Sequence, residues 1–302
     1  HAWLVKHLRP ASFLPYKLER ECHTHDLWVF EGFTTYYENV LPFRAGVLDE
    51  DKLLSLTSAR FNRVREREGF HVESLSDASF NAWTHLYKQT PDSAYCQASY
   101  YGKGAVLAFM LDAALRKAGF SLDEVLKTWF HEALADPQAR SLPDGGFFER
   151  IPVASIAERF KKLVTSSDRT LWENEWRCAL STLGMSEEAD KNTPASRMHL
   201  GLQLDGLRVR YAESRGSAYA AGLFAGDEII AVNGLRADAA TIERMITQAK
   251  GSTLHIHYFR EHLLRSAEIE VPVNPLPQPG TLKIKSPTEF GRAWIRSSNR
   301  QA

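Results

Sequence analysis

Residues 27–41 read LWVFEGFTTYYENVL, a stretch in which apolar and aromatic side chains recur at spacings of three and four. This period is typical of an α-helix that is covered on most of its faces. Pro42 follows directly, and because proline rarely continues a helix, we expect the helix to run from Asp26 to Leu41. One part of the chain is therefore built around buried helices.

The helical period continues well beyond this stretch. Gly119 stands where a helix C-cap is expected. Ser121 and Glu124 have the spacing of a capping box that opens the next helix. We expect predominantly helical structure up to about Gly184, with further helices at 49–62, 101–118 and 121–134.

The period changes after residues 187–196, EEADKNTPAS, a polar stretch that reads as a linker. Alternating patterns predict strands, and one amphipathic pattern predicts a helix at 239–250. The expected strands are 200–211, 228–232, 253–259 and 266–273. The sequence thus predicts a multidomain α + β protein: a mainly helical domain at 1–190, a small β-rich domain at 196–273, and an extended tail at 274–302. The tail holds Pro275, Pro277 and Pro279, and Trp294 is a candidate to pack back.

Bulk properties agree with two units and exclude some partners. A chain of 302 residues exceeds the size at which single cores stop growing. Its 37 basic and 37 acidic residues balance, which disfavours nucleic acid or an anionic membrane as a partner. No apolar stretch approaches the roughly 20 residues of a membrane span. We expect a soluble protein, with the cytoplasm favoured and the periplasm as the alternative, whose three cysteines are reduced core thiols.

A histidine and a glutamate suggest metal chemistry. His1 precedes Glu31 by 30 positions, and Glu31 lies within the expected helix. A hydrolytic zinc site uses three protein ligands, often two from an H-E-x-x-H helix, of which only the last letter could be present here. Copper chelation by the amine and imidazole of His1 is a second possibility, but this segment looks helical, which disfavours it.

Two longer motifs carry a family resemblance. The patterns H-x-W-x-V-K-x-x-R-P at residues 1–10 and L-W-x-x-E-G-x-T-x-Y-Y at 27–37 resemble the PDZ-containing glycyl aminopeptidases, a family of glutamate-liganded (gluzincin) zinc metallopeptidases. The resemblance runs through SLSDASFNAW at 74–83 and SYYGKGA at 99–105, and it fades between Lys127 and Ser186.

The resemblance implies the C-terminal, mainly helical half of a thermolysin-like peptidase domain that hydrolyses amino-terminal residues of peptides, small ones such as glycine or alanine among them. It implies His1 and Glu31 as zinc ligands, and it places the first histidine and the catalytic glutamate before His1. We therefore expect this polypeptide by itself to bind zinc weakly and to be inactive.

The resemblance also assigns a catalytic tyrosine. In related zinc aminopeptidases a tyrosine two positions before a lysine donates to the oxyanion, which matches Tyr101 ahead of Lys103, with Tyr100 as the neighbouring alternative. Such a donor is worth about 3 kcal/mol of transition-state stabilisation. The remaining histidines receive ordinary roles. The pair His23 and His25 precedes the Glu31 helix in a loop, and the others are His7, His71, His85 and His131.

Residues 215–234, RGSAYAAGLFAGDEIIAVNG, resemble a protease-associated PDZ domain. Asn233-Gly234 is a strong hairpin signal. The resemblance implies that a peptide C-terminus binds at Leu200, Gly201, Leu202, Gln203 and Leu204, adding as a strand beside the helix at 241–250. Two alternatives stay open: a PDZ domain that only packs on the peptidase, and a non-catalytic peptide-binding protein.

Overall fold

A computed structural model describes residues 1–278 and 280–295. The chain forms two compact units, and both are discontinuous in sequence. The helical unit contains His1–Gln89, Cys96–Glu188 and the chain from Thr281. The β-rich unit contains Thr90–Tyr95 and Ala189–Gly280. The division at Glu188 falls in the stretch that was predicted as a linker.

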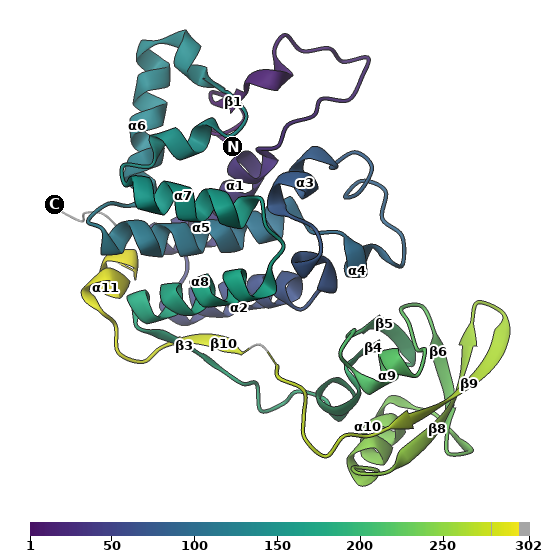
Figure 1. Cartoon of the computed structure of the whole chain (residues 1–302). Coiled ribbons are helices and arrows are strands. Elements are labelled where there is room, and N and C mark those ends of the chain that lie inside the picture. Colours follow the sequence, from purple (N-terminus) through teal and green to yellow (C-terminus); the bar gives the residue numbers. More distant parts are fainter. Residues whose placement is uncertain (279, 296–302) are drawn as a thin grey trace. The chain divides into compact units, whose positions relative to one another are not determined.

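The helical unit is organised around one long buried helix, α5, which contacts α1, α2, α8 and α11 (Figure 1). Fourteen of its eighteen residues are buried, which explains why apolar and small residues occupy most of its faces. The α-helices of this unit are α1 Phe33–Arg44, α2 Glu50–Arg65, α3 Leu75–Phe80, α5 Tyr100–Lys117, α6 Leu122–Ala135, α7 Ala154–Val164, α8 Arg169–Leu183 and α11 Glu289–Ile295. The short helix α4, Ser93–Cys96, spans the boundary after Tyr95 and belongs mostly to the β-rich unit.

Side-chain caps set several of these helix starts. Asp49, Ser99, Ser121 and Asp168 each accept a hydrogen bond from a backbone N–H in the first turn of the helix that follows. The capping box at Ser121 is confirmed. Pro42, however, does not end its helix: α1 continues to Arg44, because a proline in the last turn removes only the one bond that its own N–H would have made.

Two short sheets complete the helical unit. Strands β1 (Arg9–Pro10) and β2 (Ser141–Leu142) pair in parallel. Strands β3 (Met185–Glu188) and β10 (Thr281–Ile284) pair antiparallel. The prediction of an extended tail is therefore wrong over 281–295, where β10 and α11 pack on the helical unit and Trp294 is 1% exposed. Pro279 and residues 296–302 lie outside the described residues.

The β-rich unit is one antiparallel sheet in the order β4-β5-β6-β8-β9, with β7 paired to β6 (Figure 1). Its apolar core includes Leu202, Val209, Ile229 and Ile256, together with Ile242 and Ile246 of α10. The elements are β4 Leu202–Asp205, β5 Arg208–Ala212, α9 Ser217–Ala220, β6 Glu228–Val232, β7 Leu235–Arg236, α10 Ala239–Gln248, β8 Thr253–Arg260 and β9 Leu263–Glu270.

Residues with positive φ explain which of the turns and strands predicted for this unit are confirmed and which are wrong. Asn233 and Gly234 both have positive φ, 48° and 78°, and they form the predicted hairpin turn between β6 and β7. The single strand predicted at 200–211 is wrong, because Gly206, at φ 59°, turns the chain and makes a hairpin of β4 and β5. The strand expected at 266–273 begins and ends earlier, as β9.

Two other properties concern the whole described chain. The cysteines are free thiols, but the expectation that they lie in the core is wrong: Cys96 and Cys178 are exposed and Cys22 is half-buried. None of the helices formed by residues 1–278 and 280–295 combines the length and apolar character that crossing a bilayer requires.

Candidate functional site

Glu31 lies in a π-helical turn, Trp28–Gly32, that leads directly into α1. The other four residues of the turn are buried, whereas the Glu31 side chain remains 18% exposed. Turns of this kind are rare and occur frequently at functional sites. Burial raises the pKa of the Glu31 carboxyl, and a hydrogen bond from Tyr101 opposes that shift.

Two glycines let this turn lie directly against α5. A Cβ added to Gly32 would be 2.6 Å from the Gly104 Cα atom, and one added to Gly104 would be 2.9 Å from the Gly32 Cα atom. Any side chain at either position would force the two backbones apart. The Glu31-Gly32 and Lys103-Gly104 pairs in the sequence therefore set how closely Glu31 approaches the start of α5.

His1 reaches Glu31 from a segment of turns. The helix expected here is wrong: residues 1–8 form turns in which Val5 has φ 78°. The segment is held because Leu4 and Leu8 are buried and Trp3 stacks on Phe130 of α6, with ring centroids 4.7 Å apart. His1 Nε2 lies 3.2 Å from Glu31 Oε2.

This pair has the spacing of two ligands of one metal ion. Atoms that are each 2.0–2.2 Å from zinc, at a tetrahedral angle, lie about 3.3–3.6 Å apart, so the observed 3.2 Å is close to the lower end. Glu31 Oε2 is buried and accepts no hydrogen bond, so the 3.2 Å approach of His1 is not aligned as one. An acceptor without a donor fits a cation. In the described part of the chain, no group of three or more His, Cys, Asp or Glu residues is placed to hold a metal ion.

Tyr101 stands beside this pair, in the first turn of α5. Its ring stacks on Tyr100 at 4.7 Å, and its hydroxyl is close enough to the Glu31 carboxylate to oppose the rise in the pKa of that group. Burial, Tyr87 and the Glu31 charge raise the Tyr101 pKa well above its usual value, so the phenol keeps its proton at neutral pH. His1, Glu31 and Tyr101, all singled out from the sequence, thus converge in space.

The sequence did not identify Tyr87 as part of this cluster. Tyr87 is 61% exposed, yet its hydroxyl lies 3.3 Å from that of buried Tyr100. No motif marks it, because its segment consists mostly of turns and has no periodicity. Gly32 and Gly104 could have been noticed in the sequence, because they directly follow Glu31 and Lys103 inside two of the quoted motifs.

The other histidines lie in different settings. His23 Nδ1 contacts the Phe80 carbonyl at 2.9 Å, and His25 stacks on the Phe80 ring at 4.6 Å. His85 Nδ1 contacts Glu73 Oε1 at 2.6 Å. His71, expected to be ordinary, is partly buried, and burial lowers its pKa to about 4.

The peptide-binding residues expected in the β-rich unit lie at the end of the sheet, on β4 and the turn before it. Gly201 has φ 75°, and its N–H already donates to the Arg197 and Ser196 carbonyls. A Cβ there would be 3.1 Å from the Gly216 Cα atom. Glycine is therefore required by the backbone itself, and not only by the close approach of a ligand.

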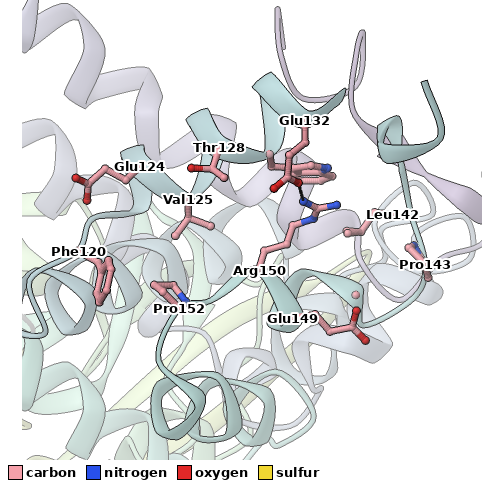
Figure 2. Close-up of a pocket in the computed structure, with 12 residues that line it drawn as sticks. Phe120, Glu124, Val125, Thr128, Glu132, Leu142, Pro143, Glu149, Arg150 and Pro152 are labelled. Atoms are coloured by element: carbon pink, nitrogen blue, oxygen red, sulfur yellow. Dashed lines mark hydrogen bonds and ion pairs between the residues drawn. The ribbon is translucent and has the colours of Figure 1, made fainter. Parts of the chain in front are cut away.

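A cavity of about 510 Å³ lies along α6 and residues 142–152 (Figure 2). Arg150 crosses it, over the Trp129 ring at 4.8 Å, and forms a 2.7 Å ion pair with Glu132. Glu124 and Glu149 add two more carboxylates to the lining. None of the site residues expected from the sequence is among the residues that line it.

Comparison with known proteins points to a peptidase. No curated protein matches the chain. Among solved structures, the chain is similar to an aminopeptidase N family protein from Idiomarina loihiensis, with 28% identity and a TM-score of 0.82. The match covers 98% of this chain and 53% of that one, so this chain spans about half its length. Residues 1–107, which contain all three converging residues, match the family described as M61 glycyl aminopeptidase.

Proposed function

We propose that the helical unit is part of a zinc-dependent aminopeptidase of the glutamate-liganded class, built as the helical half of a thermolysin-like domain. The observation that carries this proposal is the convergence of residues 1, 31 and 101 at one place, with an unpartnered carboxylate oxygen between a histidine and a tyrosine. The family match over the same residues supports a peptidase.

Each residue has a separate role in this proposal. His1 Nε2 and Glu31 Oε2 would hold the zinc, which would supply a positive charge that polarises the scissile carbonyl. Tyr101, kept protonated, donates a hydrogen bond to the oxygen on which negative charge develops.

The 302-residue polypeptide supplies two of the three protein ligands that a catalytic zinc site uses. We therefore propose that residues outside this sequence provide the remaining ligand and the general base. The polypeptide alone then binds zinc weakly and hydrolyses nothing, so activity is tested in the complete protein that contains it.

The test separates metal binding from catalysis. In the complete protein, Glu31→Gln should abolish zinc retention after dialysis, because a neutral amide replaces an anionic ligand. Tyr101→Phe should retain zinc and lower kcat by about a hundredfold with little change in KM. Zinc is measured by mass spectrometry, and kcat with an aminoacyl anilide.

Glu38→Gln is the matched control, since Glu38 lies on α1 and pairs with Arg60 at the surface. It should change neither quantity. Equal loss of zinc in the Glu31 and Tyr101 variants would remove the role given to Tyr101. Unchanged zinc in Glu31→Gln would remove the metal site. Chelator-sensitive hydrolysis by residues 1–302 alone would contradict the proposal that residues outside this sequence provide the remaining ligand and the general base.

For the β-rich unit we propose a PDZ-type module that binds the C-terminus of a peptide as an added strand. The position of β4 at the end of the sheet supports this, because an edge strand offers unpaired backbone groups. The Gly201 N–H is already bonded, so carboxylate capture would use the neighbouring N–H groups.

Peptide binding can be measured by fluorescence polarisation on the full chain. Leu204→Lys, in β4, should weaken binding of a hydrophobic peptide with a free carboxylate at least tenfold, whereas Leu263→Lys, on exposed β9, should not. Gly201→Val is unsuitable, because a β-branched residue at φ 75° would strain the fold. If an amidated peptide bound equally well, or none bound at all, a packing role would replace this one.

A further inference from the structure

Lys103 is a fully buried lysine that none of the roles above uses. It is 0% exposed, and its Nζ donates to the Phe70 carbonyl at 2.5 Å and to the Glu73 carbonyl at 2.7 Å. The amine also lies over the rings of Phe70 and Trp172, at 4.8 and 4.7 Å. A buried lysine is costly unless its donors are satisfied, and here the two carbonyls satisfy them.

The two hydrogen bonds of Lys103 require N–H donors rather than charge. Burial lowers the Lys103 pKa to about 7, so the neutral amine is accessible near physiological pH. An ammonium group has three N–H bonds and an amine has two, and two carbonyls need only two. The link between α5 and residues 70–73 is therefore preserved in both protonation states.

Glu73 extends the link to both sides of the tyrosine cluster. Its Oε2 accepts the Ala98 N–H at 2.7 Å, just before α5 begins. Its Oε1 lies 2.6 Å from His85 Nδ1, two residues before Tyr87. The segments that carry Tyr87 and the Tyr100–Tyr101 stack are thus both attached to the turn that Lys103 holds.

We propose that Lys103 is a positioning residue: it fixes the loop at residues 70–73 against α5, and thereby fixes the tyrosine cluster that presents the Tyr101 hydroxyl to Glu31. The catalytic meaning of this role rests on the function proposed above. The positioning itself does not, so the two are tested by different measurements.

The first measurement is hydrogen exchange at Ala98, which needs neither metal nor substrate. Lys103→Met keeps the length of the side chain and removes both donors, and it should speed exchange of the Ala98 amide by about tenfold or more. Lys117→Met is the matched control, since Lys117 is exposed on the last turn of the same helix. Exchange at Leu111, in the middle of α5, should be equal in both variants.

Equal Ala98 exchange in the two variants would overturn the proposal. Equal acceleration at Ala98 and Leu111 would also overturn it, because it would mean a general loss of stability. If Lys103→Met does not fold, Lys103→Gln decides: its side chain ends one atom short of the Nζ position and cannot donate to both carbonyls, so Ala98 exchange should still be faster than in Lys117→Met, and unchanged exchange would overturn the proposal.

The second measurement is a double-mutant comparison of kcat in the complete protein. If Lys103 acts through Tyr101, Lys103→Met should lower kcat about tenfold or more in the wild-type background and less than twofold in Tyr101→Phe. Losses that multiply would show that Lys103 acts by another route. A complete protein without peptidase activity would refute the proposed function, while the exchange result would still stand.

Discussion

A buried carboxylate five positions before Glu31 gives the helical unit a pH-dependent stability. Asp26 is 3% exposed and accepts the Gly145 N–H at 2.6 Å. Burial is the largest cause of its shift and raises its pKa from 3.8 to about 6, and the nearby Asp144 charge adds to the effect. The folded protein therefore holds a proton on Asp26 between about pH 4 and 6 that the unfolded chain releases.

Because the folded state binds more protons in this window, the free energy of unfolding should fall as pH rises from about 4 to 6. The slope is about 1.4 kcal/mol per pH unit, or about 3 kcal/mol in total. Asp26→Asn should remove this contribution while its amide oxygen still accepts from Gly145. Urea unfolding at pH 4, 5, 6 and 7 measures the slope, with exposed Asp51→Asn as the control. Parallel curves for wild type and Asp26→Asn would be inconsistent with the raised pKa.

At the scale of single residues, the sequence was informative where a candidate residue lies within a motif. The resemblance of the motifs that contain His1, Glu31 and Tyr101 to those of a peptidase family was enough to single these residues out, and the structure brings them together. The burial of Lys103 could not be predicted, because lysine is normally exposed and its acceptors are main-chain carbonyls, which no sequence pattern marks.

Among elements, the crossing of the π-helical turn and α5 determines the site. Replacing glycine by alanine inside a helix normally stabilises it by about 1 kcal/mol. Gly104→Ala should instead destabilise by about 2 kcal/mol, because the new Cβ would lie 2.9 Å from the Gly32 Cα atom, a backbone atom that cannot turn away. Thermal and urea unfolding measure this change.

The control is Gly102→Ala on the same helix. The obstacle there is a Val64 methyl group at 2.3 Å, which a side-chain rotation can move, so the cost should be smaller. If Gly104→Ala were as stable as wild type, the two backbones would not be in contact. If Gly104→Ala changed the positions of Glu31 and Tyr101 without a loss of stability, the π-helical turn and α5 would be able to move apart at no cost in free energy.

Element boundaries were predictable where a side chain caps the backbone. Ser121 and Glu124 located the start of α6, and Asn233-Gly234 located the β6–β7 turn. The π-helical turn at Glu31 was not predictable, since its residues have an ordinary helical period and the close approach of Gly32 to Gly104 is a tertiary contact. Gly206 shows the converse error, because a single glycine inside an alternating pattern gave no warning of a hairpin.

For the whole molecule, the number of units and their types were predictable from the change of period, but their discontinuity was not. The tail returns to the helical unit because the Trp294 Nε1 donates to the Tyr36 hydroxyl at 2.7 Å, and that hydroxyl donates to buried Asp112. The prolines of the tail favoured an extended chain in the sequence analysis, and the short strand β10 was therefore not predicted. The short segment Thr90–Tyr95 belongs to the β-rich unit although 93 residues separate Tyr95 from Ala189.

Tyr95 is the residue that attaches this segment to the β-rich unit. Its hydroxyl donates to the Ala212 carbonyl at 2.9 Å and accepts the Ala212 N–H at 3.3 Å, which satisfies both backbone groups at the end of β5. Its ring lies 5.1 Å from that of Tyr211, nearly parallel, and 5.3 Å from that of Tyr219. The stretch 196–273, predicted from the sequence as the small β-rich domain, lacks this side chain.

Tyr95→Ala should therefore destabilise the β-rich unit by about 2–4 kcal/mol, the sum of a lost aromatic contact and two unsatisfied backbone groups. Tyr95→Phe should cost less, since it keeps the ring. Hydrogen exchange in the full chain assigns the effect: amides of β5 and β6 should exchange faster, and those of α5 should not. Tyr16→Ala, an exposed tyrosine of the helical unit, controls for loss of a ring. Unchanged exchange in β5 would show that residues 189–280 are stable without the segment. Faster exchange throughout α5 would show instead that the two units unfold together, so that neither could be studied as an independent domain.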